Sequence, residues 1–152
     1  MSDLSRLAPS HVRAIAPYQP GKPIGELARE LDLDPAGIVK LASNENPQGL
    51  SPRVKAALVA ALDDIARYPD GNSFDVKAAV CRRFGSVPEQ IVLGNGSNDL
   101  LELVARTFLS PGDSVVFAQY SFAVYPLATM ATGAECIVAA ATPDFGHDLA
   151  AM

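Results

Sequence analysis

Apolar residues recur at helical spacing through the middle of the chain. The clearest predicted helix covers residues 51–65, with Ser51 as its N-cap and Pro52 in its first turn. Its apolar stripe consists of Val54, Ala57, Leu58, Ala61, Leu62 and Ile65. Pro69 and Gly71 in "RYPDGN" end this helix. A second amphipathic helix is expected over residues 76–84, with Gly85 as its C-terminal stop.

Short apolar runs then alternate with helical patterns. Asp99 and Glu102 form a capping-box pair at the start of one predicted helix, and Pro126 is expected to distort the next. The predicted strands are residues 37–43, 90–94, 114–118 and 134–140, and the predicted helices between them are residues 99–109 and 121–133. Alternating strands and helices predict an α/β domain with a mostly parallel sheet.

The two ends of the chain show weaker patterns. Residues 1–21 contain three prolines and are expected to form an irregular arm. A short helix follows near Pro23, with Leu27, Ala28 and Leu31 on one face. The final stretch, "TPDFGHDLAAM", is expected to be a loop that leads into a new helix. We therefore expect the chain to be the N-terminal part of a longer protein.

Composition narrows the class of protein. The chain has 152 residues, of which 49% are hydrophobic and 19% charged, which indicates a globular rather than a disordered chain. The net charge of −5 disfavours nucleic acids and anionic membranes as partners. No apolar run is long enough to span a bilayer, and no signal peptide is recognised. Cys81 and Cys136 fit a reducing cytoplasm, and no metal site is expected from the two isolated histidines.

The turn "GNGSN" carries the strongest chemical signal. A glycine turn between a strand and a helix presents backbone N–H groups and a helix dipole to an anion. Asp99 stands where a dinucleotide fingerprint requires glycine, and the lysine of a P-loop is missing. A phosphate monoester remains as the candidate ligand. The alternative is a turn that binds nothing.

Four stretches together carry a resemblance: "LASNENPQG", "RYPDGN", "IVLGNGSND" and "YSFAVYP". In this order and at these separations they resemble the fold-type-I pyridoxal-phosphate-dependent aminotransferases, and within them the histidinol-phosphate aminotransferase family. The resemblance runs from about Tyr18 to the end. It implies an arm and short helix over residues 1–37. Residues 38–152 would then be the first part of a large domain with three layers, αβα, which this chain leaves incomplete.

The resemblance implies a site for pyridoxal 5′-phosphate. Gly96, Ser97 and Asn98 match the turn that receives the cofactor phosphate, and Tyr120 matches the aromatic residue that stacks on the pyridine ring. Tyr68 matches a tyrosine that reaches the cofactor of the neighbouring subunit, which implies a homodimer. As alternatives, Tyr120 is an ordinary aromatic residue at a strand end and Tyr68 packs under its turn.

The resemblance also implies the reaction. Tyr18, Asn44 and Glu45 match residues that line the substrate site, and the substrates would be histidinol phosphate and 2-oxoglutarate, with glutamate as product. Sister families, the aromatic aminotransferases and threonine-phosphate decarboxylase, share this framework. A non-catalytic phosphate-binding α/β module is an alternative of another class.

The lysine that forms the Schiff base in this family is not found in the chain. Lys22, Lys40, Lys55 and Lys77 all lie outside the expected Ser-Lys segment, so we expect the chain alone to be inactive. In the family's sheet, residues 91–93 should not pair with residues 114–117. We therefore expect exposed strand edges and exposed apolar faces.

Overall fold

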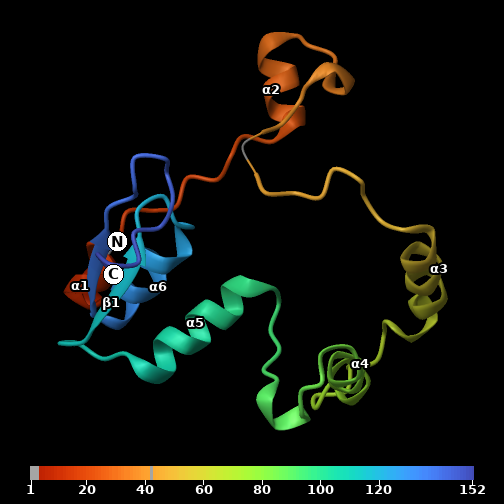
Figure 1. Cartoon of the computed structure of the whole chain (residues 1–152). Coiled ribbons are helices and arrows are strands. Elements are labelled where there is room, and N and C mark those ends of the chain that lie inside the picture. The colour runs from red at the N-terminus through yellow and green to blue at the C-terminus, as the bar shows by residue number, and fades with distance from the viewer. Residues whose placement is uncertain (1–3, 42) are drawn as a thin grey trace. The chain divides into compact units, whose positions relative to one another are not determined.

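The computed structural model, drawn in Figure 1, describes residues 4–41 and 43–152. By their internal contacts these residues divide into two units. The first unit joins the N-terminal residues up to Tyr18 with Glu89–Met152, and the second unit is Gln19–Pro88. The boundary after residue 37, between the arm with its short helix and the large domain, stays a prediction.

A pair of parallel strands forms the centre of the first unit. Strand β1, Ser114–Ala118, pairs with β2, Glu135–Ala139, in a register that runs from Ser114 opposite Glu135 to Ala118 opposite Ala139. Helix α6, Val124–Thr132, connects the strands and packs against both of them and against α5, Ser97–Phe108. The α/β prediction and both of these strands are confirmed.

Small side chains let α6 approach the strands closely. Phe117 of β1 is buried, and its ring lies 6.1 Å from the ring of Tyr125 at the start of α6. Thr129 is also buried, and its hydroxyl donates to the carbonyl of Tyr125 at 2.8 Å, which satisfies the polar group. The other buried residues of this unit are Ala105, Ala118, Ala128, Ala134 and Ala139.

The sequence predicted an irregular N-terminal arm, but parts of the arm are helical. It contains a 3₁₀ turn, η1 (Leu4–Leu7), and one helical turn, α1 (Ser10–Arg13), which contacts α6. Pro9 occupies the N-cap position of α1 with φ −52°. Because proline fixes φ near the helical value, it favours the start of a helix here.

The second unit consists of helices without a strand among its described residues. They are α2 (Ile24–Leu31), η2 (Pro35–Gly37), α3 (Pro52–Ala61), η3 (Leu62–Asp64) and α4 (Phe74–Phe84), and η4 (Pro88–Gln90) follows at the junction of the units. Ser51 Oγ accepts from the N–H of Val54 at 3.3 Å, and Gly85 ends α4 with φ 71°, so both predicted helix boundaries are confirmed. The α-helical part of the first predicted helix stops at Ala61, because two acidic residues would follow at its negative end.

Two predicted strands are wrong. Residues 38–41, 43 and 91–94 belong to no helix or strand, and Ala42 lies outside the described residues. A strand needs a neighbour for its backbone N–H and C=O groups, and within the described ranges β1 and β2 pair only with each other. Residues 91–93 do not pair with β1, as expected from the resemblance.

Three helix details also differ from the prediction. Helix α5 begins at Ser97, so Asp99 is its third residue and not its N-cap. Helix α6 begins at Val124, which places Pro126 in the first turn, where a missing N–H breaks no hydrogen bond. Residues 148–152 form a turn in which Asp148 accepts from the N–H groups of Ala150 and Ala151, rather than a helix.

Large apolar side chains remain exposed in this chain. On the predicted stripe of α3 and η3, Leu58 is 54% exposed and Ile65 is 77% exposed. Among the described residues, none with a large side chain is fully buried. The expectation of exposed apolar faces is therefore confirmed. No helix in the described ranges is both long and apolar enough to cross a bilayer.

Gly133 offers a test of this packing. It ends α6 with φ 80°, and a Cβ built there would lie 3.1 Å from Pro111 Cγ and 3.4 Å from His11 Nδ1. Gly133→Ala should lower the free energy of unfolding of the first unit by about 1–2 kcal/mol. Urea unfolding followed through the amide NMR signals of β1 and β2 measures this change. Gly37→Ala is the control, because nothing lies within 4 Å of a Cβ there, and equal unfolding midpoints for the two variants would contradict the packing described.

Candidate functional site

The turn before α5 has a backbone shape that only glycine adopts readily. Gly96 has φ 79° and ψ −178°, a region closed to residues with a side chain. Its N–H donates to the carbonyl of Gly94 at 2.9 Å. A Cβ at Gly94 would lie 2.8 Å from Asp99 Cβ, so the turn also lies close against its own helix. Asp99 Oδ2 accepts from the N–H of Asn95 at 2.9 Å and holds the turn in place.

The start of α5 is suited to an anion. No side chain caps this 12-residue helix, and Ser97 and Asn98 are both exposed. The first N–H groups of a helix have no partner within it, and the helix dipole adds positive potential there. A Cβ at Gly96 would meet nothing within 4 Å, so the approach to these donors is open. The turn therefore fits a phosphate group.

Tyr120 lies just beyond the carboxyl end of β1 in a strained conformation. Its φ is 64°, which is unusual for an aromatic residue and costs on the order of 1–3 kcal/mol. The N–H of Ser121 donates to the carbonyl of Ala118 at 3.2 Å and closes the turn around it. The Tyr120 side chain is 72% exposed, so it is not part of the core. It is available to stack on a planar ligand.

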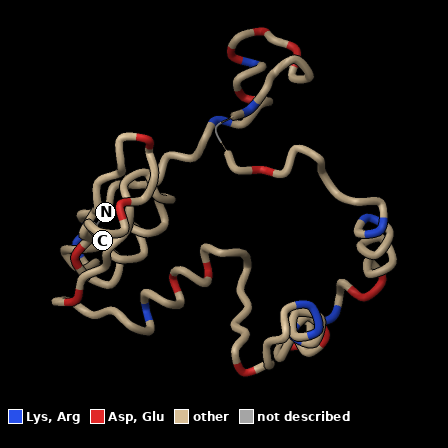
Figure 2. The backbone as a smooth tube through the Cα atoms, viewed as in Figure 1, with Lys and Arg blue, Asp and Glu red and all other residues tan. Residues whose placement is uncertain are grey.

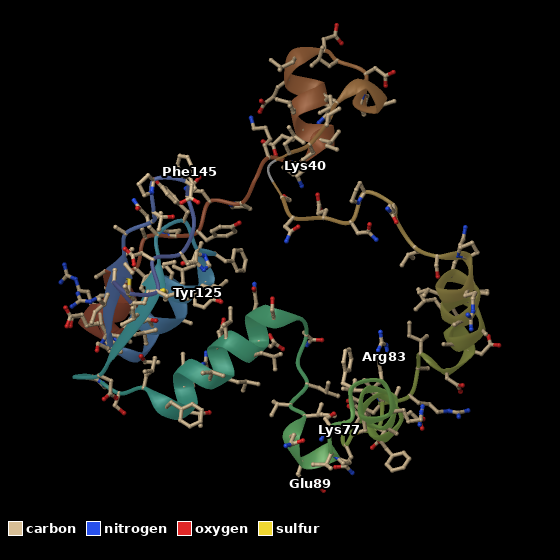
Figure 3. The ribbon with its side chains drawn as sticks, in the orientation of Figure 1. Lys40, Lys77, Arg83, Glu89, Tyr125 and Phe145 are labelled. Carbon is tan, nitrogen blue, oxygen red and sulfur yellow. The ribbon has the colours of Figure 1, made fainter. Side chains whose placement is uncertain are left out.

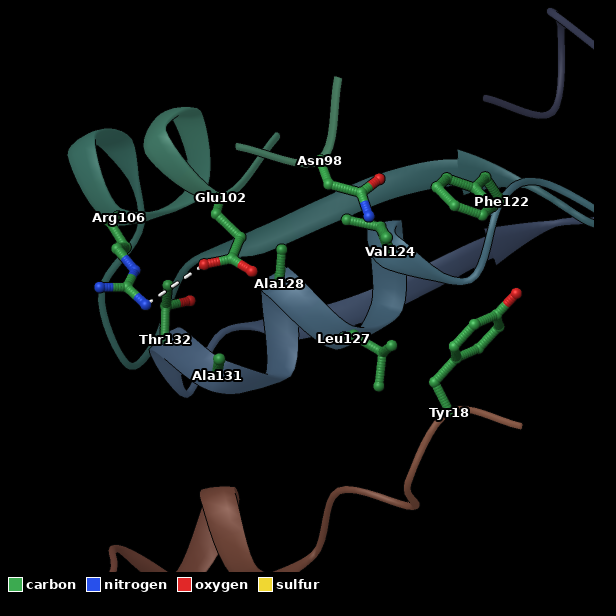
Figure 4. A pocket seen from close by; sticks show the side chains of 10 residues that line it. All are labelled: Tyr18, Asn98, Glu102, Arg106, Phe122, Val124, Leu127, Ala128, Ala131 and Thr132. Carbon is green, nitrogen blue, oxygen red and sulfur yellow. Dashed lines mark hydrogen bonds and ion pairs between the residues drawn. The ribbon is translucent and has the colours of Figure 1, made fainter. Parts of the chain in front are cut away.

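Two predicted site residues of the first unit line one hollow of about 390 Å³ (Figure 4). They are Tyr18 from the arm and Asn98 from α5. The hollow is also lined by Glu102, Arg106, Phe122, Val124, Leu127, Ala128, Ala131 and Thr132. The structure thus brings together Tyr18 and Asn98, which lie far apart in the sequence.

The other eight lining residues were not predicted as site residues from the sequence. Glu102 and Arg106 form an ion pair at 3.3 Å, drawn as a dashed line in Figure 4. Successive spacings of four residues, from Asn98 to Glu102 and from Glu102 to Arg106, place all three on one face of α5, a signal that the sequence offered. Phe122 also lines the hollow and is 48% exposed.

The polar stretch around Asn44 lies in the second unit. Glu45 Oε2 pairs with Lys40 Nζ at 3.2 Å, and Lys40 is labelled in Figure 3. Asn46 closes a local turn, since its Oδ1 accepts from the N–H of Gln48 at 3.0 Å and its Nδ2 donates to the carbonyl of Gly49 at 3.1 Å. Asn44 is exposed. Asn46 is therefore a turn residue, whereas the roles of Asn44 and Glu45 toward a substrate stay predictions.

Tyr68 does not pack under its turn. Its side chain is fully exposed, beside a shallow apolar hollow whose walls include Leu58 and Ile65. The turn after it is held by Asp70, which accepts from the N–H groups of Asn72 and Phe74, both at 2.9 Å. These bonds, the one from Phe74 first, lower the pKa of the Asp70 carboxyl below its ordinary value.

Charge is unevenly divided between the units. All four lysines, Lys22, Lys40, Lys55 and Lys77, lie in the second unit. Figure 2 draws lysines and arginines together in blue and the acidic residues in red. The unit that contains Gly96, the end of β1 and the hollow has no lysine in its sequence. No group of side chains suited to a metal ion occurs in the described ranges.

Comparison with known proteins places the chain in a family. The sequence profile of the aminotransferase class I and II family matches residues 36–152, so the chain belongs to that family. It is 63% identical over 152 residues to the histidinol-phosphate aminotransferase of Methylobacillus flagellatus, and 58% identical over 146 residues to histidinol-phosphate aminotransferase 2 of Nitrosospira multiformis. The chain covers 41% and 37% of these two relatives, so it spans about two fifths of their length.

Solved structures share the fold of this chain. The fold is similar to a histidinol-phosphate aminotransferase from Sinorhizobium meliloti, solved in complex with pyridoxal-5′-phosphate, with a TM-score of 0.72 over 89% of this chain and 35% of that one, at 23% identity. A putative aminotransferase from Burkholderia pseudomallei matches with a TM-score of 0.62 over 73% of this chain and 34% of that one, at 28% identity. The prediction of an incomplete α/β aminotransferase fold is confirmed.

The Asp70 turn predicts a pH dependence. Folding lowers the pKa of Asp70 below its ordinary value of 3.8, so the charged carboxylate stabilises the turn fully at pH values above 3.8. This stabilisation is lost as the pH falls through the lower pKa of the folded state. The protection of the Phe74 amide, which is its exchange rate relative to the intrinsic rate at the same pH, should therefore fall as the pH drops below about 4, and Asp70→Asn should remove this step. Asp63→Asn is the control, because it leaves the hydrogen bonds of the turn intact. An unchanged exchange profile in Asp70→Asn would contradict the proposed role.

Proposed function

We propose that this chain supplies the cofactor-phosphate turn and part of the substrate site of a histidinol-phosphate aminotransferase that uses pyridoxal 5′-phosphate. The observation that carries the proposal is the 63% identity across all 152 residues to an enzyme of that name. At 23% identity, the structural match to the enzyme solved with the cofactor supports the fold only. The proposed reaction is amino transfer between histidinol phosphate and 2-oxoglutarate, which yields glutamate.

The residues of the first unit would bind the cofactor. The backbone N–H groups of Ser97 and Asn98 would bind its phosphate, and Gly96 would keep the approach open. Tyr120 would stack on its ring and set the plane of the ring. When bound, the cofactor supplies an electron sink for the bond at the substrate α-carbon. Tyr18, near Asn98, would contact the substrate.

The second unit would contribute to assembly and to the substrate entrance. Tyr68 is fully exposed, which supports a contact with a second subunit and hence a homodimer. Asn44 and Glu45 would line the entrance to the substrate site. The net charge of −5 supports small-molecule partners over nucleic acid or membrane, and the two free cysteines support a cytoplasmic location.

The missing reactive amine limits what the chain can do. A Schiff-base lysine must reach the cofactor ring, and none of the four lysines of this chain lies in the Ser-Lys segment that the family uses. We therefore place that lysine in the part of the relatives that lies beyond the matched region. The 152-residue chain alone would have no aminotransferase activity.

A chimera tests the proposal. These 152 residues replace the matching 41% of the Methylobacillus flagellatus enzyme. The chimera should form glutamate from histidinol phosphate and 2-oxoglutarate, and the 152-residue chain alone should form none. Aromatic amino acids and threonine phosphate, offered in parallel, separate the sister activities. A folded chimera that binds pyridoxal 5′-phosphate but does not act on histidinol phosphate would refute the assignment.

The phosphate turn is tested in the same chimera. Gly96→Ala should raise the Kd for pyridoxal 5′-phosphate about tenfold or more, a loss of about 1.4 kcal/mol, because alanine cannot hold the turn open. Gly37→Ala, in the second unit, should leave the Kd unchanged. Absorbance titration with the cofactor gives the Kd of each variant. Equal affinity of the two variants would show that the turn does not bind the cofactor.

A further inference from the structure

Two aromatic rings meet beyond the carboxyl ends of the paired strands. The rings of Tyr120, after β1, and Phe145, after β2, have centroids 6.0 Å apart and planes tilted by 51°. Both residues have a positive φ, 64° at Tyr120 and 63° at Phe145. Two bulky residues in this unfavourable region, in contact with each other, indicate that the surrounding structure constrains both.

Phe145 lies in a short closed loop (Figure 3). An antiparallel bridge joins Ala141 to His147, and the N–H of Thr142 donates to the carbonyl of Gly146 at 3.1 Å. The N–H of Phe145 donates to the carbonyl of Thr142 at 2.9 Å. A Cβ at Gly146 would lie 2.9 Å from Thr142 Oγ1, so the loop is tightly closed behind the ring.

Gln119 joins this loop to the end of β1. Its N–H donates to the carbonyl of Ala139 at 2.7 Å, and its side-chain oxygen accepts from the N–H of Ala141 at 3.1 Å. Gln119 directly precedes Tyr120. The two turns that carry the aromatic rings are therefore held to each other by the backbone and the side chain of Gln119.

The ring contact is not core packing. Tyr120 is 72% exposed and Phe145 is 77% exposed, so neither ring is removed from water. What the contact can do is restrict rotation of the Tyr120 side chain, because a ring on one side excludes some of its rotamers.

We propose that Phe145 is a positioning residue that fixes the ring plane of Tyr120 for stacking on a planar heteroaromatic ligand. This assignment rests on the proposed function, in which that ligand is the pyridine ring of pyridoxal 5′-phosphate. Phe145 itself touches Tyr120 and not the reacting atoms.

The first test reads Tyr120 without cofactor. A fluorine on the Tyr120 ring, introduced as 3-fluorotyrosine at that position in the chimera, reports ring orientation by ¹⁹F NMR. Phe145→Ala and Phe145→Leu should shift and average the signal, because leucine keeps apolar bulk but has no ring. Phe145→Tyr should restore the wild-type signal. Phe84→Ala is the matched control, since Phe84 is 74% exposed and lies in the second unit.

The second test reads the bound cofactor. Phe145→Ala and Phe145→Leu should retain bound pyridoxal 5′-phosphate but lose roughly half of its visible circular dichroism per bound molecule, because the stacking angle is no longer fixed. Phe145→Tyr and Phe84→Ala should retain the full signal. In kinetics, kcat should fall more than KM rises, because substrate contacts are unchanged.

The outcomes separate the two proposals. A wild-type chimera that folds without binding the cofactor refutes the proposed function, and the role of Phe145 with it. Binding with ¹⁹F and dichroism signals unchanged in Phe145→Ala overturns the role of Phe145 alone. If Phe145→Ala does not fold, the comparison of Phe145→Leu with Phe145→Tyr tests the role of Phe145 instead. Equal ¹⁹F and dichroism signals in those two variants overturn that role.

Discussion

The parallel pairing of β1 with β2 is the constraint on which the first unit depends. Because the strands are parallel and in register from Ser114 to Ala118, their carboxyl ends lie at the same edge. Helix α6 must then cross back between them, and small residues on its inner face let it lie close to the strands. The crossing places Phe122 beside α5, where the hollow forms.

Tyr120 and Phe145, two residues to which we assign a proposed role, occur where this pairing ends. Tyr120 follows the last residues of β1, and the loop with Phe145 follows β2, so a single edge carries both aromatic rings. Ligands of α/β sheets bind at such carboxyl edges, because the loops there are free to carry function. The strain at Tyr120 and Phe145 is sustained by the hydrogen bonds of Gln119 and of the loop itself.

The proposed cofactor site and the exposed apolar stripe lie in different units of the chain. Its first unit offers helix N–H donors and an aromatic ring but no amine, and its second unit carries an apolar stripe on α3 that remains in water. An exposed stripe of this kind is unusual for a finished soluble surface. The coverage of about two fifths of the relatives' length is consistent with both features.

Local chemistry was readable from the sequence wherever neighbours in the chain decide the structure. Ser51 capped its helix, Gly85 and Gly133 ended theirs, and the apolar runs of β1 and β2 became strands. The sequence also indicated a turn that requires glycine in "GNGSN", and Gly96 has φ 79° there. Such a conformation can be predicted because it depends on the residue itself and not on a distant contact.

The sequence by itself therefore determined most of the helices, the two paired strands and the glycine turn before α5, but it missed the helical turns of the arm and predicted a C-terminal helix that does not form. Only the tertiary structure decided that residues 38–41 and 91–94 would not be strands, because a strand forms only where a second one satisfies its backbone. It also brought Tyr18 to Asn98 and Phe145 to Tyr120, since contacts between distant segments depend on how the strands and α6 pack and not on any local pattern.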